Sequence, residues 1–278
     1  MQFKRNLRGE LDLLGAAVAF SFVNLFVKLA GREFPGLFVS GIRFAIGVAL
    51  ALAVVIARRT RLERAFLPDV LLRGFFGALS MTSTYIAIGL TGPGRAALLS
   101  NTYPLFVTIF GALFFAEKPT RRIVGSLAFC LVGAVLVVRD GSGAKLAGDL
   151  LALAGSVFAG IAVNYVRRAS KGGVDPFLLY LSPSLFGLPV LAFASLPSGP
   201  PGAASIFFLV AVGLGAFAAQ ALMARGYRSV SAGKGSIVFF LETGLTVLLG
   251  VLFAGEAFTA RFGLGLVLIF AGVWYNRR

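Results

Sequence analysis

The chain has 278 residues, of which 58% are hydrophobic and only 13% are charged, and its formal net charge is +15. A soluble protein carries about twice that share of charged residues, so the composition excludes an ordinary soluble domain and indicates that lipid surrounds the chain. The sequence has no histidine and one cysteine, which excludes a serine–histidine triad, a histidine metal site and an internal disulfide.

Ten apolar segments follow one another along the chain, and most approach the roughly 20 residues that a membrane-spanning helix needs. The connections between them are short and rich in glycine, proline and charge, as is typical of turns. We therefore expect an all-α membrane protein. In chain order the expected helices are Leu11–Ala30, Gly36–Ala57, Val70–Leu90, Gly94–Ala116, Arg122–Val138, Asp149–Val166, Pro176–Leu196, Ala204–Met223, Lys234–Ala254 and Phe262–Tyr275.

The lysines and arginines gather on one side of these expected crossings. On the side that holds both chain ends there are 18 of them, whereas 5 fall on the other side. The positive-inside rule then places both termini in the cytoplasm of a bacterial inner membrane. Clusters of this kind are not the basic stripe of a nucleic-acid-binding surface, so we expect no nucleic-acid partner. The bilayer is the expected environment, and no feature requires a protein partner, which is compatible with a monomer.

The second half of the chain repeats the first at an offset of about 139 residues, which predicts domains at 1–140 and 145–278. Gly94-Arg95 aligns with Gly233-Lys234, and Glu117 aligns with Glu256. Each half has five expected helices, an odd number, so the two halves enter the membrane in opposite directions. Paired inverted repeats are typical of transporters that use alternating access, although a duplication could also serve stability alone.

A family resemblance rests on this repeat. Residues 96–138 and 236–274 each place a proline or glutamate within a helix, a glutamate at its end, a threonine soon after, and then a glycine-bearing helix. Both resemble the EamA repeat of the drug/metabolite transporter superfamily, over essentially the whole chain. The high phenylalanine content is similar to that of bacterial amino-acid exporters of the YddG type. The resemblance implies a transporter that exports small metabolites such as amino acids, including aromatic or other apolar ones.

Charged side chains within the expected helices are the first candidates for a substrate site, because they are costly in the membrane. Glu242 lies roughly 12 Å into its helix, near the membrane centre. It could bind an amine or a proton, or it could pair with Arg43 or with helix-end amides. Arg43 could bind a substrate carboxylate as a two-pronged donor, or it could snorkel outward or pair internally.

Neutral polar residues within the apolar helices form a second group of candidates. Such groups hydrogen-bond substrates, but they also hold helices together. The repeat pairs Tyr103 with Glu242, so each half would offer one polar group to a shared space near the midplane. The candidate substrate-binding residues are Asn24, Arg43, Tyr85, Asn101, Tyr103, Asn164, Gln220 and Glu242.

Three further residues have expected structural roles. Pro104 lies within an expected helix, frees a backbone carbonyl and is a candidate hinge. Glu117 and Glu256 each lie in the turn before the next helix, where a carboxylate can accept hydrogen bonds from free amides at the positive end of a helix.

The sequence predicts transport without ATP and without a cofactor or metal. The glycine-rich stretches GSGAK and SAGKGS do not match the phosphate-binding loop, because position 228 is arginine where that loop requires glycine. An intramembrane enzyme, such as a lipid-modifying transferase, is an alternative that lacks histidine and paired carboxylates near a membrane surface. A channel is a further alternative, and saturable flux would distinguish a carrier from it.

Overall fold

The computed structural model describes residues 2–115, 121–139, 145–195, 200–226 and 232–275, and it is all-helical over these ranges. The α-helices are α1 (Gln2–Ala30), α2 (Gly36–Ala57), α3 (Leu67–Thr91), α4 (Pro93–Ser100), α5 (Tyr103–Phe115), α6 (Arg121–Val138), α7 (Leu146–Lys171), α8 (Pro176–Gly187), α9 (Ala203–Gly226), α10 (Ala232–Ala254) and α11 (Ala260–Tyr275). Two 3₁₀ helices, η1 (Arg64–Phe66) and η2 (Leu188–Phe193), complete the described elements.

The helices occupy the segments expected from the sequence, with two differences in continuity. The expected helix Gly94–Ala116 is two helices, α4 and α5, which separate at Asn101 and Thr102. The expected helix Pro176–Leu196 ends as an α-helix at Gly187 and continues as η2. Proline lies just after both breaks, at positions 104 and 189. Because proline lacks an N–H and restricts the residue before it, both sites favour interruption of the α-helical ladder.

The chain is a multi-pass membrane protein by the length and polarity of its helices. Within the described residues, seven helical stretches are long and apolar enough to cross a membrane, and two shorter apolar stretches accompany them. Large apolar side chains, including Phe193, Phe207 and Leu131, are exposed on the outside of the bundle. Such a surface is stable against hydrocarbon, where helices satisfy their own backbone hydrogen bonds.

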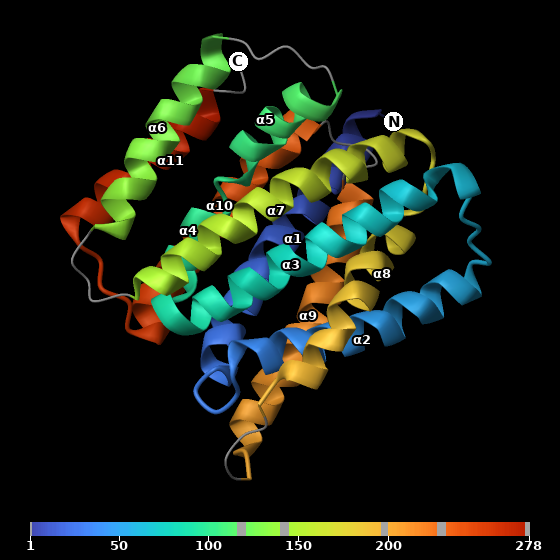
Figure 1. Ribbon diagram of the computed structural model, residues 1–278, viewed down its shortest axis with the longest axis horizontal. Helices are drawn as coiled ribbons and strands as arrows, with labels where there is room; N and C mark the ends of the chain where they lie inside the picture. The colour runs from blue at the N-terminus through green and yellow to red at the C-terminus, as the bar shows by residue number, and fades with distance from the viewer. Residues whose placement is uncertain (1, 116–120, 140–144, 196–199, 227–231, 276–278) are drawn as a thin grey trace.

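Packing between the two halves of the sequence is reciprocal. Helix α1 packs on α9 and α10, whereas α7 packs on α3, α4 and α5. Helix α2 packs on α8 and α9, whereas α8 packs on α2 and α3. The elements that the repeat makes equivalent also pack on each other, α4 with α10 and α6 with α11. Figure 1 shows the α6–α11 pair at one edge of the bundle, away from α2, α8 and α9.

The α6–α11 contact depends on two glycines. A Cβ atom added at Gly133 would lie 2.8 Å from the carbonyl oxygen of Gly265, and one added at Gly265 would lie 2.7 Å from that of Gly133. The two backbones therefore touch directly, as at other small-residue crossings in membranes.

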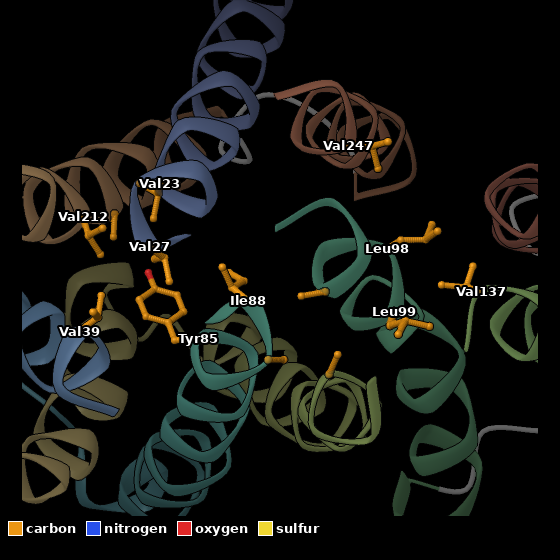
Figure 2. Close-up of a cluster of buried hydrophobic side chains, with 14 of the residues drawn as sticks. Val23, Val27, Val39, Tyr85, Ile88, Leu98, Leu99, Val137, Val212 and Val247 are labelled. Atoms are coloured by element: carbon orange, nitrogen blue, oxygen red, sulfur yellow. The ribbon is translucent and has the colours of Figure 1, made fainter. Parts of the chain in front are cut away.

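An apolar core joins helices from both halves. Figure 2 shows Val23 and Val27 of α1, Tyr85 and Ile88 of α3 and Val212 of α9 in one part of this core. Leu98 and Leu99 of α4, Val137 of α6 and Val247 of α10 form the other part. The core therefore fixes the position of α4 relative to α10, which matters for the cavity described next.

Candidate substrate cavity

A cavity of about 260 Å³, lined mainly by apolar surface with several polar side chains, lies next to the break between α4 and α5. Helices α1, α3, α7 and α10 form the remaining walls, so both halves of the sequence contribute to it. Its lining residues are Phe20, Asn24, Ser80, Met81, Thr84, Ala97, Ser100, Asn101, Tyr103, Ala159 and Glu242.

The break between α4 and α5 supplies polar groups at this depth. The backbone N–H of Asn101 donates to the Ala97 carbonyl and closes α4. The Thr102 hydroxyl donates to the Leu99 carbonyl at 2.7 Å, which satisfies a carbonyl at the end of that helix. The Asn101 side chain is left to reach across to α10, where its Nδ2 donates to Thr243 Oγ1 at 2.6 Å. Interrupted helices inside a membrane are tolerated where they are buried in protein or line a cavity.

Glu242 of α10 forms the acidic wall of the cavity. Its Oε1 accepts a long hydrogen bond of 3.4 Å from Asn24 Nδ2, and the same nitrogen lies 3.5 Å from Thr246 Oγ1. Among the described residues, no lysine or arginine forms an ion pair with this carboxylate, and Arg43 contacts Met81 instead. The expected alternative of a Glu242–Arg43 pair is therefore not observed. A weakly bonded carboxylate facing a cavity can bind an ammonium group or a proton.

Hydroxyl groups of α3 and α4 also line the cavity. Thr84 Oγ1 and Ser100 Oγ lie 3.2 Å apart and link α3 to α4. Tyr103 adds an aromatic ring with a polar end, which suits an amphiphilic molecule. The sequence repeat pairs Tyr103 with Glu242, and both side chains do line the same cavity. Ser80, Thr84 and Ser100 were not predicted, because serine and threonine also occur throughout membrane helices as helix contacts.

The structure brings together four of the candidate substrate-binding residues, Asn24, Asn101, Tyr103 and Glu242, around this cavity. The other four lie outside its lining. Asn164 is buried and donates to the Val107 and Gly160 carbonyls, which ties α7 to α5. Gln220 is half-buried on α9.

The remaining two candidates, Arg43 and Tyr85, form a separate buried group behind Met81. The guanidinium carbon of Arg43 lies 5.5 Å from the centre of the Tyr85 ring. Met81 contacts Arg43 through its sulfur and also lines the cavity.

Sequence reasoning missed a buried ion pair at the junction of α3, α4 and α7. Arg95 donates from Nε and Nη2 to the two carboxylate oxygens of Asp149, each at 2.7 Å. Thr91 also donates to Asp149, and Arg95 Nη2 reaches the Val138 carbonyl at 3.1 Å. Both charged side chains are almost completely buried. The sequence does place Arg95 and Asp149 in the first turns of two helices. Nothing in the sequence pattern, however, indicates that these two residues pair with each other.

Glu256 caps a helix, but not the one that follows it in sequence. Its carboxylate accepts from the Gly94 amide at 2.9 Å and from the Arg95 amide at 3.3 Å, at the start of α4. Thr259 instead caps α11, accepting from the Phe262 amide. Gly92 has φ of +100°, a conformation that favours glycine and turns the chain from α3 into α4 beside Glu256.

The other two residues with expected structural roles are Glu117 and Pro104. Glu117 lies outside the described residues. Pro104 is the second residue of α5 rather than a residue within one continuous helix.

Glu256 lies in the connection between α10 and α11, and it makes stability depend on pH. Burial raises its pKa from 4.5 to about 7, although the Arg95 and Gly94 amides and the charge of Lys28 lower it. Because the folded state holds this proton more tightly, stabilisation that is present below pH 4.5 is lost as the pH rises to about 7. We expect the unfolding midpoint of the wild type to fall across this range relative to that of Glu256→Gln. A constant difference between the two proteins over the same range would contradict this assignment.

The bundle and its cavity define a polytopic membrane protein with a chamber that both halves of the sequence line. The sequence pattern of the EamA-like transporter family matches it twice, at residues 7–139 and 146–277. The chain therefore belongs to the EamA-like transporter family.

Several known proteins are similar to this chain. The pseudopaline exporter CntI of Pseudomonas aeruginosa is 30% identical over 163 residues, which cover 58% of this chain and 57% of that protein. Solute carrier family 35 member G1 of Mus musculus is 26% identical and matches 80% of this chain and 65% of its own length. The chain thus spans only between half and two thirds of these relatives. One crystal structure, 21% identical, matches the fold with a TM-score of 0.63 over 96% of this chain and 95% of its own.

Proposed function

We propose that this transporter exports small metabolites, with amino acids as the favoured class, by alternating access and without ATP. The observation that carries the proposal is the cavity at the α4–α5 break, to which Glu242 and Asn24 contribute a carboxylate and an amide, and Tyr103 an aromatic ring. A carboxylate can bind the ammonium of an amino acid, and Asn24 and Asn101 can donate to its carboxylate. The name of the similar pseudopaline exporter supports export of a small molecule.

The proposed mechanism uses two inverted repeats of five membrane crossings, at 1–140 and 145–278. The reciprocal packing of α1 with α9 and of α7 with α3 supports this arrangement, because it is the contact pattern of two related halves. Rocking of one half against the other would open the cavity first to one side and then to the other. The Arg95–Asp149 pair joins α4 of the first half to α7 of the second. We propose that this contact closes one end of the bundle in the conformation described.

Transport by purified protein in liposomes tests the function. We expect saturable uptake of one or more radiolabelled amino acids from a panel, with no requirement for ATP, and acceleration when the same amino acid is present inside. Flux that rises linearly with concentration and carries single-channel current would instead establish a channel. Loss of any amino-acid flux, with turnover of a lipid substrate, would favour the enzyme alternative.

The orientation has its own prediction. We propose a bacterial inner-membrane location with both termini in the cytoplasm, supported by the excess of lysine and arginine on that side. Arg32 and Ser170 are exposed at opposite expected sides of the membrane. We expect cysteine introduced at Arg32, in a Cys130→Ala background, to react with an impermeant reagent in the periplasm, and cysteine at Ser170 to be protected. The reverse pattern would overturn the orientation.

A further inference from the structure

Two arginines near α2, α3 and α8, one buried and one partly buried, have no carboxylate partner among the described residues. Arg43 of α2 is 3% exposed, and the Nε atoms of both Arg43 and Arg73 of α3 are buried without a hydrogen-bond partner in the described part of the chain. The Tyr180 hydroxyl of α8 is also buried, and it makes no hydrogen bond to the residues that the structure describes. Buried polar groups are normally satisfied, so three unused donors in one region require an explanation.

The side chain of Arg73 points along α3 toward its C-terminal end. It lies in the second turn of α3, from which a long side chain could snorkel back to water. Its guanidinium instead lies beside Gly77, one turn deeper into α3, where a Cβ atom would collide with Nη1.

The guanidinium of Arg43, on α2, contacts the same face of α3 one turn further along that helix. Its Nη1 lies 2.9 Å from the sulfur of Met81, which is four residues beyond Gly77 and so on the same side of the helix. The two guanidinium groups therefore lie beside neighbouring turns of α3, at Gly77 and at Met81. The Tyr180 hydroxyl completes the group from α8, because a Cβ atom at Gly47, one turn beyond Arg43 on α2, would lie 3.2 Å from it.

No acidic side chain in the described ranges forms an ion pair with Arg43 or Arg73. The ion pairs found among the described residues join Asp149 to Arg95, Asp69 to Arg168 and Asp12 to Arg225. A thioether sulfur is only a weak acceptor for Arg43. Two like charges in a medium of low dielectric constant are unfavourable unless a counter-ion is present, so the arrangement is suited to an anion from outside the chain.

Met81 connects this group to the cavity. Its side chain lines the cavity on one side and contacts Arg43 on the other. Methionine has three rotatable bonds and adapts readily, so a change of its rotamer can expose Arg43 to the cavity without moving a helix.

We propose that Arg43 and Arg73, with the Tyr180 hydroxyl, form an anionic subsite that binds a carboxylate of the transported molecule. Glu242, on the other side of Met81, can hold one ammonium, so the additional positive pair selects an organic anion whose carboxylates outnumber its ammonium groups. This inference rests on the proposed transport function and specifies its substrate class.

A matched pair of probes tests the subsite. L-Glutamate and L-glutamine differ by one carboxylate, and each can be titrated into the purified protein while thermal unfolding is followed. We expect glutamate to raise the unfolding midpoint of the wild type at concentrations roughly tenfold lower than glutamine does. Arg43→Gln and Arg73→Gln should abolish this preference, whereas Arg43→Lys should retain part of it. Arg225→Gln removes an equal charge at an exposed site and should keep the full preference.

Three outcomes would overturn the subsite. These are equal responses of the wild type to glutamate and glutamine, retention of glutamate preference in both Arg43→Gln and Arg73→Gln, and an effect of sodium chloride or sodium sulfate as large as that of glutamate. Failure of the transport proposal would look different, because glutamate preference would then persist in binding while liposomes showed no flux of any amino acid.

Discussion

The substitution Glu242→Gln is expected to weaken transport roughly 10- to 150-fold at low substrate concentration, while leaving the fold intact. A hydrogen bond to a charged group contributes about 1.5–3 kcal/mol, which corresponds to that range of affinity. Glutamine keeps the size of the side chain and can still bond to Asn24, so the loss would come from the missing charge. The half-saturating concentration in liposome uptake measures the effect directly.

The matched control is Glu33→Gln, which makes the same chemical change at an exposed site. Glu33 accepts from the Gly202 amide in the connections outside the cavity, so its loss should leave uptake within about twofold of the wild type. Unchanged uptake in Glu242→Gln would remove that residue from the substrate site. Aggregation of Glu242→Gln in place of reduced uptake would show that the carboxylate only holds α1 and α10 together.

The second large effect is expected on stability. Arg95→Ala should cost about 3–5 kcal/mol, because it leaves the Asp149 carboxylate buried and without its charged partner. Asp149→Ala should cost a similar amount for the converse reason. Unfolding of the purified protein in detergent, followed by helical circular dichroism, gives both values.

Two comparisons make the stability prediction specific. Arg225→Ala breaks an exposed pair with Asp12 and should cost no more than about 1 kcal/mol. The double variant Arg95→Met/Asp149→Leu should recover much of the loss, because apolar groups of similar volume avoid an uncompensated charge. A cost near 1 kcal/mol for Arg95→Ala would mean that water reaches the pair.

The membrane class and most helix positions were predictable from the sequence, because the period and length of apolar segments reflect the bilayer itself. Glu242 and Tyr103, which line the cavity, could also be picked out from the sequence. Polar residues within apolar helices are conspicuous, and the repeat paired these two. The interruption at Asn101 was not predicted. Proline at position 104 weakens a helix, but whether the helix breaks depends on tertiary partners such as Thr243.

Partner choice between distant helices was the least predictable feature. Asp149 and Arg95 lie 54 residues apart, and Glu256 reaches an amide 162 residues away. Glu256 was expected to meet the amides of a neighbouring helix end, yet it caps α4 of the other half. Arg73 carried no signal beyond a charge near a helix end, where outward snorkelling is the ordinary behaviour. Long-range packing decides each of these contacts, and local sequence patterns do not encode it.

We propose that one cavity between the halves opens alternately to each side of the membrane. Accessibility of Ser100, which lines the cavity, tests it most directly. In a Cys130→Ala background, cysteine at position 100 should react with an impermeant thiol reagent added from either side. Cysteine at Ser156, which is buried and bonded to Thr102 away from the cavity lining, should react from neither. Reaction of position 100 from one side only, or from neither, would contradict alternating access through this cavity.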